Sequence, residues 1–215
     1  MGPFLRLSAV LLVLALPWAA QADMSASQQS YDFQVLREGS PIGHHRVVVR
    51  SEGTRSEVNI DIELRVKAAG FLTLYRYLHQ SREVWEGDRL ISLNSTTDND
   101  GRQEYLNAEA GPDGLRVEGS RYRGTLPADA MPTSYWRPDF VRRATIMDSQ
   151  NGRPLDLVIR PQQSELASAA RDDVPAQRYD LSGEVELTLW YGRDGRWVKT
   201  AFKARDGSRI EYLLQ

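Results

Sequence analysis

The three histidines are the side chains of this chain best suited to bind a metal ion, and two of them, His44 and His45, are adjacent. The residues around this pair alternate as in a β-strand, where neighbouring side chains point to opposite faces. One ion therefore cannot easily take both rings, and His79 completes none of the common ligand spacings. The sequence predicts no metal site, with the three histidines at the surface or rim of the fold.

Motifs for other catalytic chemistry are also missing. The chain has no cysteine, which excludes a thiol nucleophile and a disulfide. It has no Gly-x-Ser-x-Gly sequence, and a Ser-His-Asp triad would have to be assembled from distant residues. Residues 98–101 resemble the start of a calcium loop but lack its terminal Glu, so a hairpin turn explains them better. We predict no catalytic residue and no cofactor.

An aromatic segment at residues 132–140 is the most distinctive feature of the chain. Tyr and Trp combine a large apolar area with a polar tip, so they suit the portal of a site for an amphiphile, and the adjacent arginines suit an anionic head group. The alternative is that these aromatic residues plug an open end of a sheet as ordinary core. Two further tyrosines come from residues 71–86, which are apolar on both alternating faces near their start. The candidate ligand-binding residues are Tyr75, Tyr77, Tyr135, Trp136, Arg137 and Phe140.

Strands must position these residues. Apolar and polar residues alternate strictly at 58–67, which is typical of a strand with one buried and one solvated face. The run at 43–51 and the turn at 52–54 complete a predicted hairpin. Asp-Gly pairs mark four further turns, and the last two separate three strands of a C-terminal meander. The fold class that this predicts is mainly β, with little helix: a single curved antiparallel sheet of meandering hairpins that forms a half-barrel or open barrel.

Two segments depart from this pattern. Residues 123–144 contain three prolines and no regular period, with one helical turn expected at 139–143. Long connections of this kind are often functional. Residues 164–173 fit either a short helix or a strand, and both alternatives stay open.

The N-terminus carries a targeting signal. Residues 1–22 contain one charge, Arg6, then an apolar run, Pro17 and a closing Ala-Gln-Ala, which together indicate a secretory signal peptide. The apolar run is too short for a membrane anchor, which needs about 20 residues. We expect a flexible lead-in at 23–30, a single β-rich domain at 31–215 and no transmembrane segment in the mature chain. The expected location is the periplasm, with secretion to the medium as the alternative.

The charge balance excludes one class of partner. The chain has 27 Lys and Arg against 29 Asp and Glu, a formal net charge of −2. Nucleic-acid binding depends largely on basic residues that neutralise phosphates, so we expect no nucleic-acid partner.

Three segments carry a resemblance to a known family: Pro-Thr-Ser-Tyr-Trp at 132–136, the turn at 148–152 and the closing segment 189–212. The chain resembles a family of exported bacterial proteins of unknown function over nearly all of its mature length. The resemblance implies export and a single β domain, and it implies no activity, ligand or site residue. A more distant architectural similarity is to periplasmic half-barrels of the lipoprotein-carrier kind, in which a curved sheet wraps an apolar cavity. Without a cysteine to carry a lipid, the chain is more similar to the soluble carrier than to its membrane-anchored receptor.

These observations favour an exported protein that binds or carries an amphiphilic or lipid-like ligand. The alternative is a non-enzymatic protein of the cell envelope that docks another envelope protein through its sheet edge or aromatic segment. An uncharacterised hydrolase is the third hypothesis.

Overall fold

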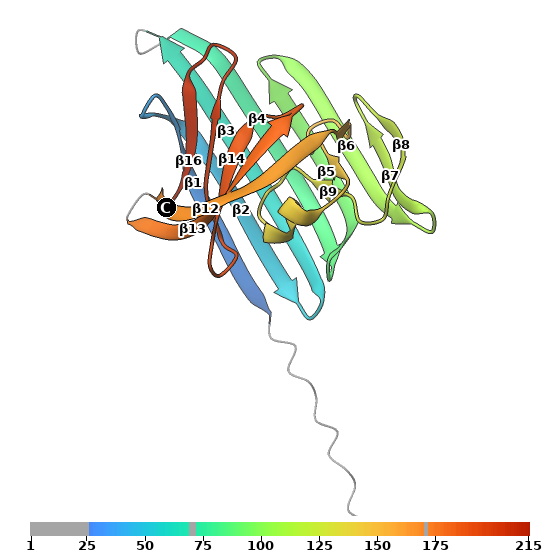
Figure 1. Ribbon diagram of the computed structural model, residues 1–215. Coiled ribbons are helices and arrows are strands. Elements are labelled where there is room, and N and C mark those ends of the chain that lie inside the picture. The colour runs from blue at the N-terminus through green and yellow to red at the C-terminus, as the bar shows by residue number, and fades with distance from the viewer. Residues whose placement is uncertain (1–25, 69–71, 170–171) are drawn as a thin grey trace, which may run out of the picture.

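The computed structural model describes residues 26–68, 72–169 and 172–215 (Figure 1). The predicted signal peptide lies outside these residues, as does the start of the predicted lead-in at 23–25. Strands account for 71% of the described residues and helix for 3%, which confirms the prediction of a mainly β protein. Within the described ranges, no helix has the length and apolar character needed to cross a lipid bilayer.

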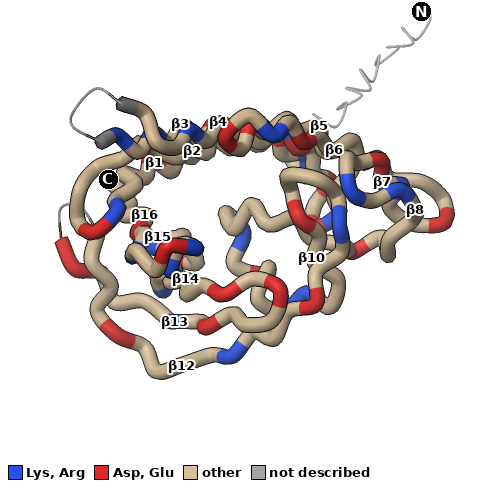
Figure 2. The backbone as a smooth tube through the Cα atoms, turned by 90° about the horizontal axis from the view of Figure 1, so that it is seen from above, with Lys and Arg blue, Asp and Glu red and all other residues tan. Residues whose placement is uncertain are grey.

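Thirteen antiparallel strands form the main sheet. They are β1 (Ser27–Arg37), β2 (Ser40–Glu52), β3 (Arg55–Ala68), β4 (Leu72–Glu86), β5 (Arg89–Asn99), β6 (Arg102–Gly111), β7 (Gly114–Gly119), β8 (Arg123–Leu126), β12 (Leu157–Ser168), β13 (Asp173–Gly183), β14 (Leu187–Gly192), β15 (Trp197–Lys203) and β16 (Arg209–Leu214). The sheet runs from β12 through β16 to β1 and on to β8, so it has two free edges and is not closed into a barrel. Figure 2 shows the sheet bending until β12 and β13 face the long strands across the interior, which confirms the predicted curved sheet.

Hairpins build the sheet where the sequence predicts them. Strands β2 and β3 pair from Gly43↔Leu64 to Glu52↔Arg55, and the inward side chains of β3, such as Val58 and Ile60, are buried. Each of the four predicted Asp-Gly turns joins two neighbouring strands, and the glycine of each has a positive φ. Strands β14, β15 and β16 form the predicted meander, and β16 pairs with β1, which joins the two ends of the described chain.

Two predictions about element boundaries change. Strand β1 begins at Ser27, so the predicted flexible lead-in is wrong for residues 27–30, whose backbone pairs with residues 48–51 of β2 although their side chains are exposed. Residues 164–168 form the end of β12, which settles the open choice in favour of a strand. There Ala167 pairs with Val174 and packs beside Trp190. Cross-strand pairing and this small apolar cluster outweigh the helix propensity of the alanines.

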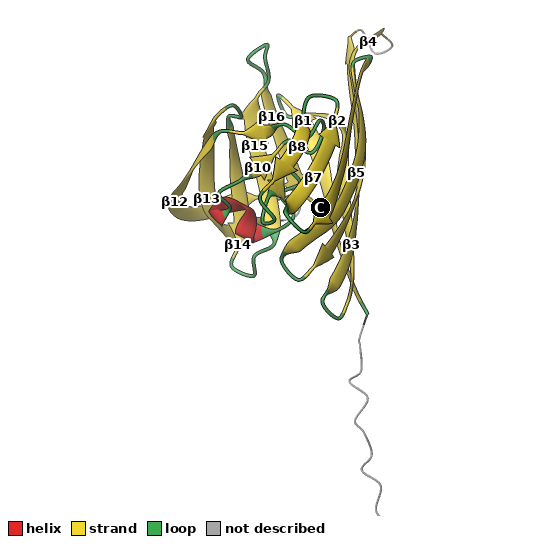
Figure 3. Cartoon of the chain, turned by 90° about the vertical axis from the view of Figure 1, so that its right-hand side faces the viewer, coloured by secondary structure: helices red, strands yellow, loops and turns green. Residues whose placement is uncertain are grey.

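A segment between β8 and β12, residues 131–155, covers part of the concave face, and we call it the plug. It contains β9 (Met131–Pro132), the 3-10 helix η1 (Pro138–Arg142), β10 (Ile146–Met147) and β11 (Pro154–Leu155), and its three short strands form a second sheet. Figure 3 shows the helical turn, predicted at 139–143, between β12–β14 and the long strands. The side chains of Met131, Phe140 and Met147 are buried in the same core as Phe33 and Trp197.

Candidate functional site

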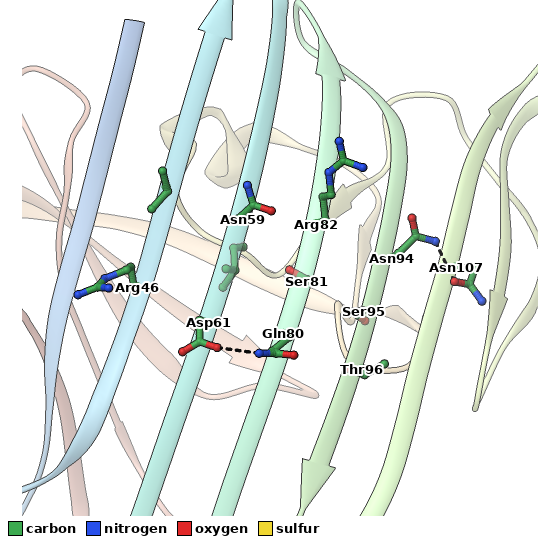
Figure 4. Close-up of a pocket in the computed structure, with 12 residues that line it drawn as sticks. Arg46, Asn59, Asp61, Gln80, Ser81, Arg82, Asn94, Ser95, Thr96 and Asn107 are labelled. Atoms are coloured by element: carbon green, nitrogen blue, oxygen red, sulfur yellow. Dashed lines mark hydrogen bonds between the residues drawn. The ribbon is translucent and has the colours of Figure 1, made fainter.

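A groove of about 510 Å³ lies on the outer face of β2–β6 (Figure 4). Its polar side chains already pair with one another. Gln80 donates to Asp61 at 3.1 Å, and Asn94 donates to Asn107 at 2.9 Å. None of the sequence-predicted residues lines this groove. The concave face is the better candidate, because buried polar atoms without a hydrogen-bond partner among the described residues occur there.

The inward-pointing residues of β4, which we call its inner row, include several polar side chains that are buried in the core. Alternate residues of this strand point inward, and three of them, His79, Ser81 and Glu83, are polar yet only 3%, 7% and 0% exposed. Buried polar groups cost free energy unless they are hydrogen-bonded, so such a row is rarely a simple packing feature. The row also includes Tyr77 above and Trp85 below, and it is the centre of the candidate site.

Glu83 holds the plug against the sheet. Its Oε2 accepts hydrogen bonds from the indole N–H of Trp85 at 2.7 Å and from that of Trp136 at 3.1 Å. Its Oε1 has no partner among the described residues. Burial raises the pKa of this carboxyl, while the bonds from the two indoles oppose that shift. Trp136 of the plug is therefore hydrogen-bonded to Glu83 of β4, which lies 53 positions earlier in the sequence.

Arg137 is already committed to structural contacts. Its guanidinium lies 4.7 Å from the ring centroid of Trp85 and 5.6 Å from that of Trp136. It also pairs with Asp139 at 2.9 Å and donates to the carbonyl of Gly87 at 2.9 Å. These contacts already occupy the guanidinium that the sequence suggested for binding an anionic head group. Arg137 therefore stabilises the plug instead.

Phe140 and the backbone of Tyr135 also belong to the plug. Phe140 is fully buried, with its ring centroid 5.0 Å from that of Tyr135. Tyr135 has a φ of 59°, which is uncommon for a residue other than glycine. The hydroxyl of Tyr191 donates to its carbonyl at 2.8 Å and helps to hold this conformation. Of the two alternatives for the aromatic segment, Trp136 and Phe140 therefore fit the core plug rather than a portal.

Three half-buried tyrosines lie on the inner side of the fold. Tyr212 and Tyr77 lie in one transverse row of the sheet, linked by the pairs Tyr212↔Val35, Val35↔Gly43, Gly43↔Leu64 and Leu64↔Tyr77. Tyr135 belongs to the plug, and all three side chains are half-buried. Burial raises the pKa of each hydroxyl, and the Tyr212 and Asp148 side chains raise the pKa of both Tyr77 and Tyr135. These shifts place the three hydroxyls inside the fold rather than on its outer surface.

The predicted ligand residues thus divide into two groups. Tyr77 and Tyr135 are both half-buried against the core, Tyr77 on β4 and Tyr135 on the plug, and the hydroxyl of Tyr75, two residues before Tyr77 on β4, donates to Asn99 at 3.0 Å. Trp136, Arg137 and Phe140 belong to the plug. Glu83, Asp148 and Tyr212 were not predicted from the sequence, although all three are titratable groups whose pKa is raised by burial.

Two of the three histidines are core residues, so their predicted surface or rim position is wrong. His45 is 4% exposed, and neither of its ring nitrogens has a hydrogen-bond partner in the described part of the chain. Its ring lies 5.2 Å from Trp197 and 5.7 Å from Tyr212, and burial lowers its pKa to about 3. His79 shares a hydrogen bond of 2.8 Å with Thr97, and burial lowers its pKa to about 4. Only His44 is exposed, opposite Asp61.

Metal binding and hydrolysis gain no support from this geometry. Within residues 26–68, 72–169 and 172–215, no group of three or more His, Asp or Glu side chains is arranged to hold a metal ion. The Oγ of Ser81 has no hydrogen-bond partner among those residues, so the neighbouring His79 does not activate it. What the interior offers is hydrogen bonding beside apolar surface.

A family model described as "Domain of unknown function (DUF6134)" matches residues 33–215. No curated protein matches the chain.

Proposed function

The chain belongs to the family described as a domain of unknown function (DUF6134), and we propose that its concave interior binds a small amphiphilic, lipid-like molecule in the periplasm. The observation that carries the proposal is a set of half-buried tyrosines, Tyr77, Tyr135 and Tyr212, that pack against the apolar core of the curved sheet. Ligand sites commonly combine an apolar lining with a few polar groups of this kind.

The apolar part of the site lies beside Tyr77 and Tyr212. Val35, Leu64 and Ile210 form a buried cluster there, and partly buried residues such as Ile62 and Phe202 pack against it. These side chains offer apolar surface to a ligand tail, while the plug closes the opposite part of the concave face. Export is the expectation from residues 1–22, and a periplasmic location is part of the proposal.

Native mass spectrometry tests binding directly. The protein is isolated from the periplasm of the organism that makes it, its mass is measured under native conditions, and bound material is extracted with organic solvent. We expect a co-purifying apolar or amphiphilic molecule that raises the native mass. A mass equal to that of the bare chain, together with no uptake of added amphiphiles, contradicts the proposal.

A pair of matched variants locates the site. Ile62→Phe adds bulk to the concave face, whereas Val48→Phe adds the same bulk to the outer groove. We expect Ile62→Phe to lose the bound molecule and Val48→Phe to keep it, with both variants folded by circular dichroism. The reverse result would assign the ligand to the outer groove.

The second candidate is docking of another envelope protein at the sheet edge. Strand β12 is an edge strand, and it exposes Leu166 at 65% and Val158 at 46%. An added strand could pair with such an edge. A bare native mass combined with a cross-link from β12 to a partner would favour this function over ligand binding.

A further inference from the structure

The free edge of β12 is complementary to a second copy of itself. Among the described strands β12 pairs only with β13, most of its side chains are exposed, and it lies at the outer rim of the curved sheet in Figure 2. We propose that two copies of the chain pair through this edge, with their β12 strands antiparallel about a two-fold axis between Gln162 and Gln163. This pairing is independent of the binding function proposed above.

The backbone groups that face the free edge match between two copies. The carbonyl of Asp156 accepts from the N–H of Glu184 at 3.2 Å, so Asp156 faces β13. At the other end of β12, the N–H of Ala169 donates to the carbonyl of Asp172 at 3.4 Å, so Ala169 also faces β13. Because this direction alternates along a strand, the residues that face the free edge are 157, 159 and 161, and 164, 166 and 168. Full antiparallel overlap of two β12 strands places the first three opposite the last three, so each edge-facing residue meets another.

The irregularity in β12 favours a second copy over an ordinary strand. Between Pro161 and Ser164 the chain of β12 advances three residues, while its partners on β13 advance from 179 to 177. The edge-facing residues on either side are therefore three positions apart instead of two, and a regular strand loses its register there. In the two-fold pair, the extra residue of one copy lies opposite that of the other. The missing N–H of Pro161 also discourages other strands, whereas its carbonyl faces the N–H of Ser164 of the second copy.

On the outer face, this overlap brings opposite charges together. Arg160 and Glu165 share that face, because their partners on β13, residues 180 and 176, are an even number of positions apart. Glu165 accepts from the indole of Trp190 at 2.7 Å and keeps a side chain that is 44% exposed. In the described part of the chain, Arg160 forms no ion pair and reaches only the Oγ of Ser182, at 3.5 Å. The overlap places Arg160 of each copy opposite Glu165 of the other, in the non-hydrogen-bonded type of pair where side chains lie closest.

The two exposed apolar side chains of this edge also gain apolar neighbours. Leu166 is 65% exposed and Val158 is 46% exposed. In the same overlap, Leu166 lies opposite Ile159 of the second copy, which packs against the main core. Val158 lies opposite Ala167 of the second copy, which belongs to a small buried cluster. A shift of two residues would instead set Val158 opposite Glu165, so the register that pairs the whole strand is also the one that matches its side chains.

An exchange of charges tests the pairing by sedimentation equilibrium from about 1 μM to about 1 mM protein. We expect the wild type to dimerise, and Arg160→Glu and Glu165→Arg each to weaken the dimer about tenfold, since each sets like charges opposite one another twice. An equal mixture of the two variants should associate as the wild type does, because each copy then carries the charge that the other needs. Arg123→Glu, on the opposite edge strand β8, is the control and should dimerise as the wild type does.

A wild type that stays monomeric throughout, or a mixture no tighter than either variant alone, overturns the proposal. A loss of association in Arg123→Glu but in neither β12 variant overturns it as well, because it would assign the contact to β8.

A pair of cysteines tests the register without relying on charge. The chain has no cysteine, so the double variant Arg160→Cys/Glu165→Cys carries only these two. Within one copy they lie about 16 Å apart along the strand, too far for a disulfide. We expect mild oxidation to link two copies of the double variant, as seen on a denaturing gel, and to leave Arg160→Cys alone unlinked, because its two cysteines lie five positions apart across the axis. No covalent dimer of the double variant, or equal cross-linking of the two variants, overturns the proposed pairing.

Discussion

At the scale of single residues, Glu83 is the clearest link between polarity and stability. Glu83→Ala leaves the indole N–H groups of Trp85 and Trp136 buried without an acceptor, so we expect the free energy of unfolding to fall by about 3 kcal/mol. Glu83→Gln keeps one acceptor oxygen and should lose less. Urea unfolding followed by tryptophan fluorescence measures both. Glu109→Ala, which removes an exposed carboxylate paired with Arg116, is the control and should change little. Equal losses at the two positions would contradict this role of Glu83.

His45 predicts a pH dependence of stability. Its pKa is about 3 in the folded state, below its unfolded value near 6.5, so its contribution is complete above the unfolded pKa and is lost as the pH falls toward the folded one. His79 shifts in the same direction, whereas Glu83 and Asp148 have raised pKa values and act in the opposite direction.

The His45→Leu variant isolates this contribution. Between pH 7 and pH 5, urea unfolding of the wild type should lose about 2 kcal/mol more than the variant does. At pH 7 the variant should be at least as stable as the wild type, because leucine removes two ring nitrogens that have no partner among the described residues. The exposed His44→Gln serves as the control. The same pH response in wild type and His45→Leu would contradict the burial of a neutral His45.

The histidines show what the sequence can and cannot predict at this scale. Strand alternation correctly separated His44 from His45. It did not identify the buried one, although His45 shares its face with Val47 and Val49, because a histidine is ordinarily assigned to a wet surface. A neutral imidazole can be buried at moderate cost, and the two valines were the signal for it.

At the scale of elements, Gly43 is required by the close approach of β2 to β3. A Cβ at this position would lie 1.9 Å from the backbone carbonyl oxygen of Glu63. We expect Gly43→Ala to lower the free energy of unfolding by about 3 kcal/mol, since the backbone of the neighbouring strand must move. Gly39→Ala is the matched control, because it also has a positive φ but meets nothing within 4 Å, and it should cost about 1 kcal/mol. Chemical denaturation of both variants measures the difference, and similar losses would contradict a steric requirement at Gly43.

Elements held by contacts between nearby residues could be predicted from the sequence, whereas those held by distant residues could not. The Asp-Gly turns and the alternating runs are encoded locally, and the sequence predicted the hairpins and the meander from them. The plug folds through distant partners, such as Trp136 with Glu83 and Tyr135 with Tyr191. The sequence predicted the helical turn of the plug, but it did not predict that the plug lies on the concave face. For the same reason, the packing of Tyr135 beside Trp197 could not be predicted.

At the scale of the whole molecule, the open sheet predicts a gradient of protection against hydrogen exchange. Strands β1–β5 have a paired neighbour on each side, whereas β12 has one neighbour, carries Pro161 and is irregular between Pro161 and Ser164. Edge backbone groups reach solvent and open locally at a lower cost than central ones. We expect the amides of β3 to exchange slowest, at the global unfolding rate, and those of the outer side of β12 to exchange fastest in dilute protein. Mass spectrometry of deuterated peptides across a range of protein concentrations measures this gradient. Slow exchange of β12 at the lowest concentration would contradict a free edge, whereas protection of β12 that rises with concentration is the result expected if two copies of the chain pair there.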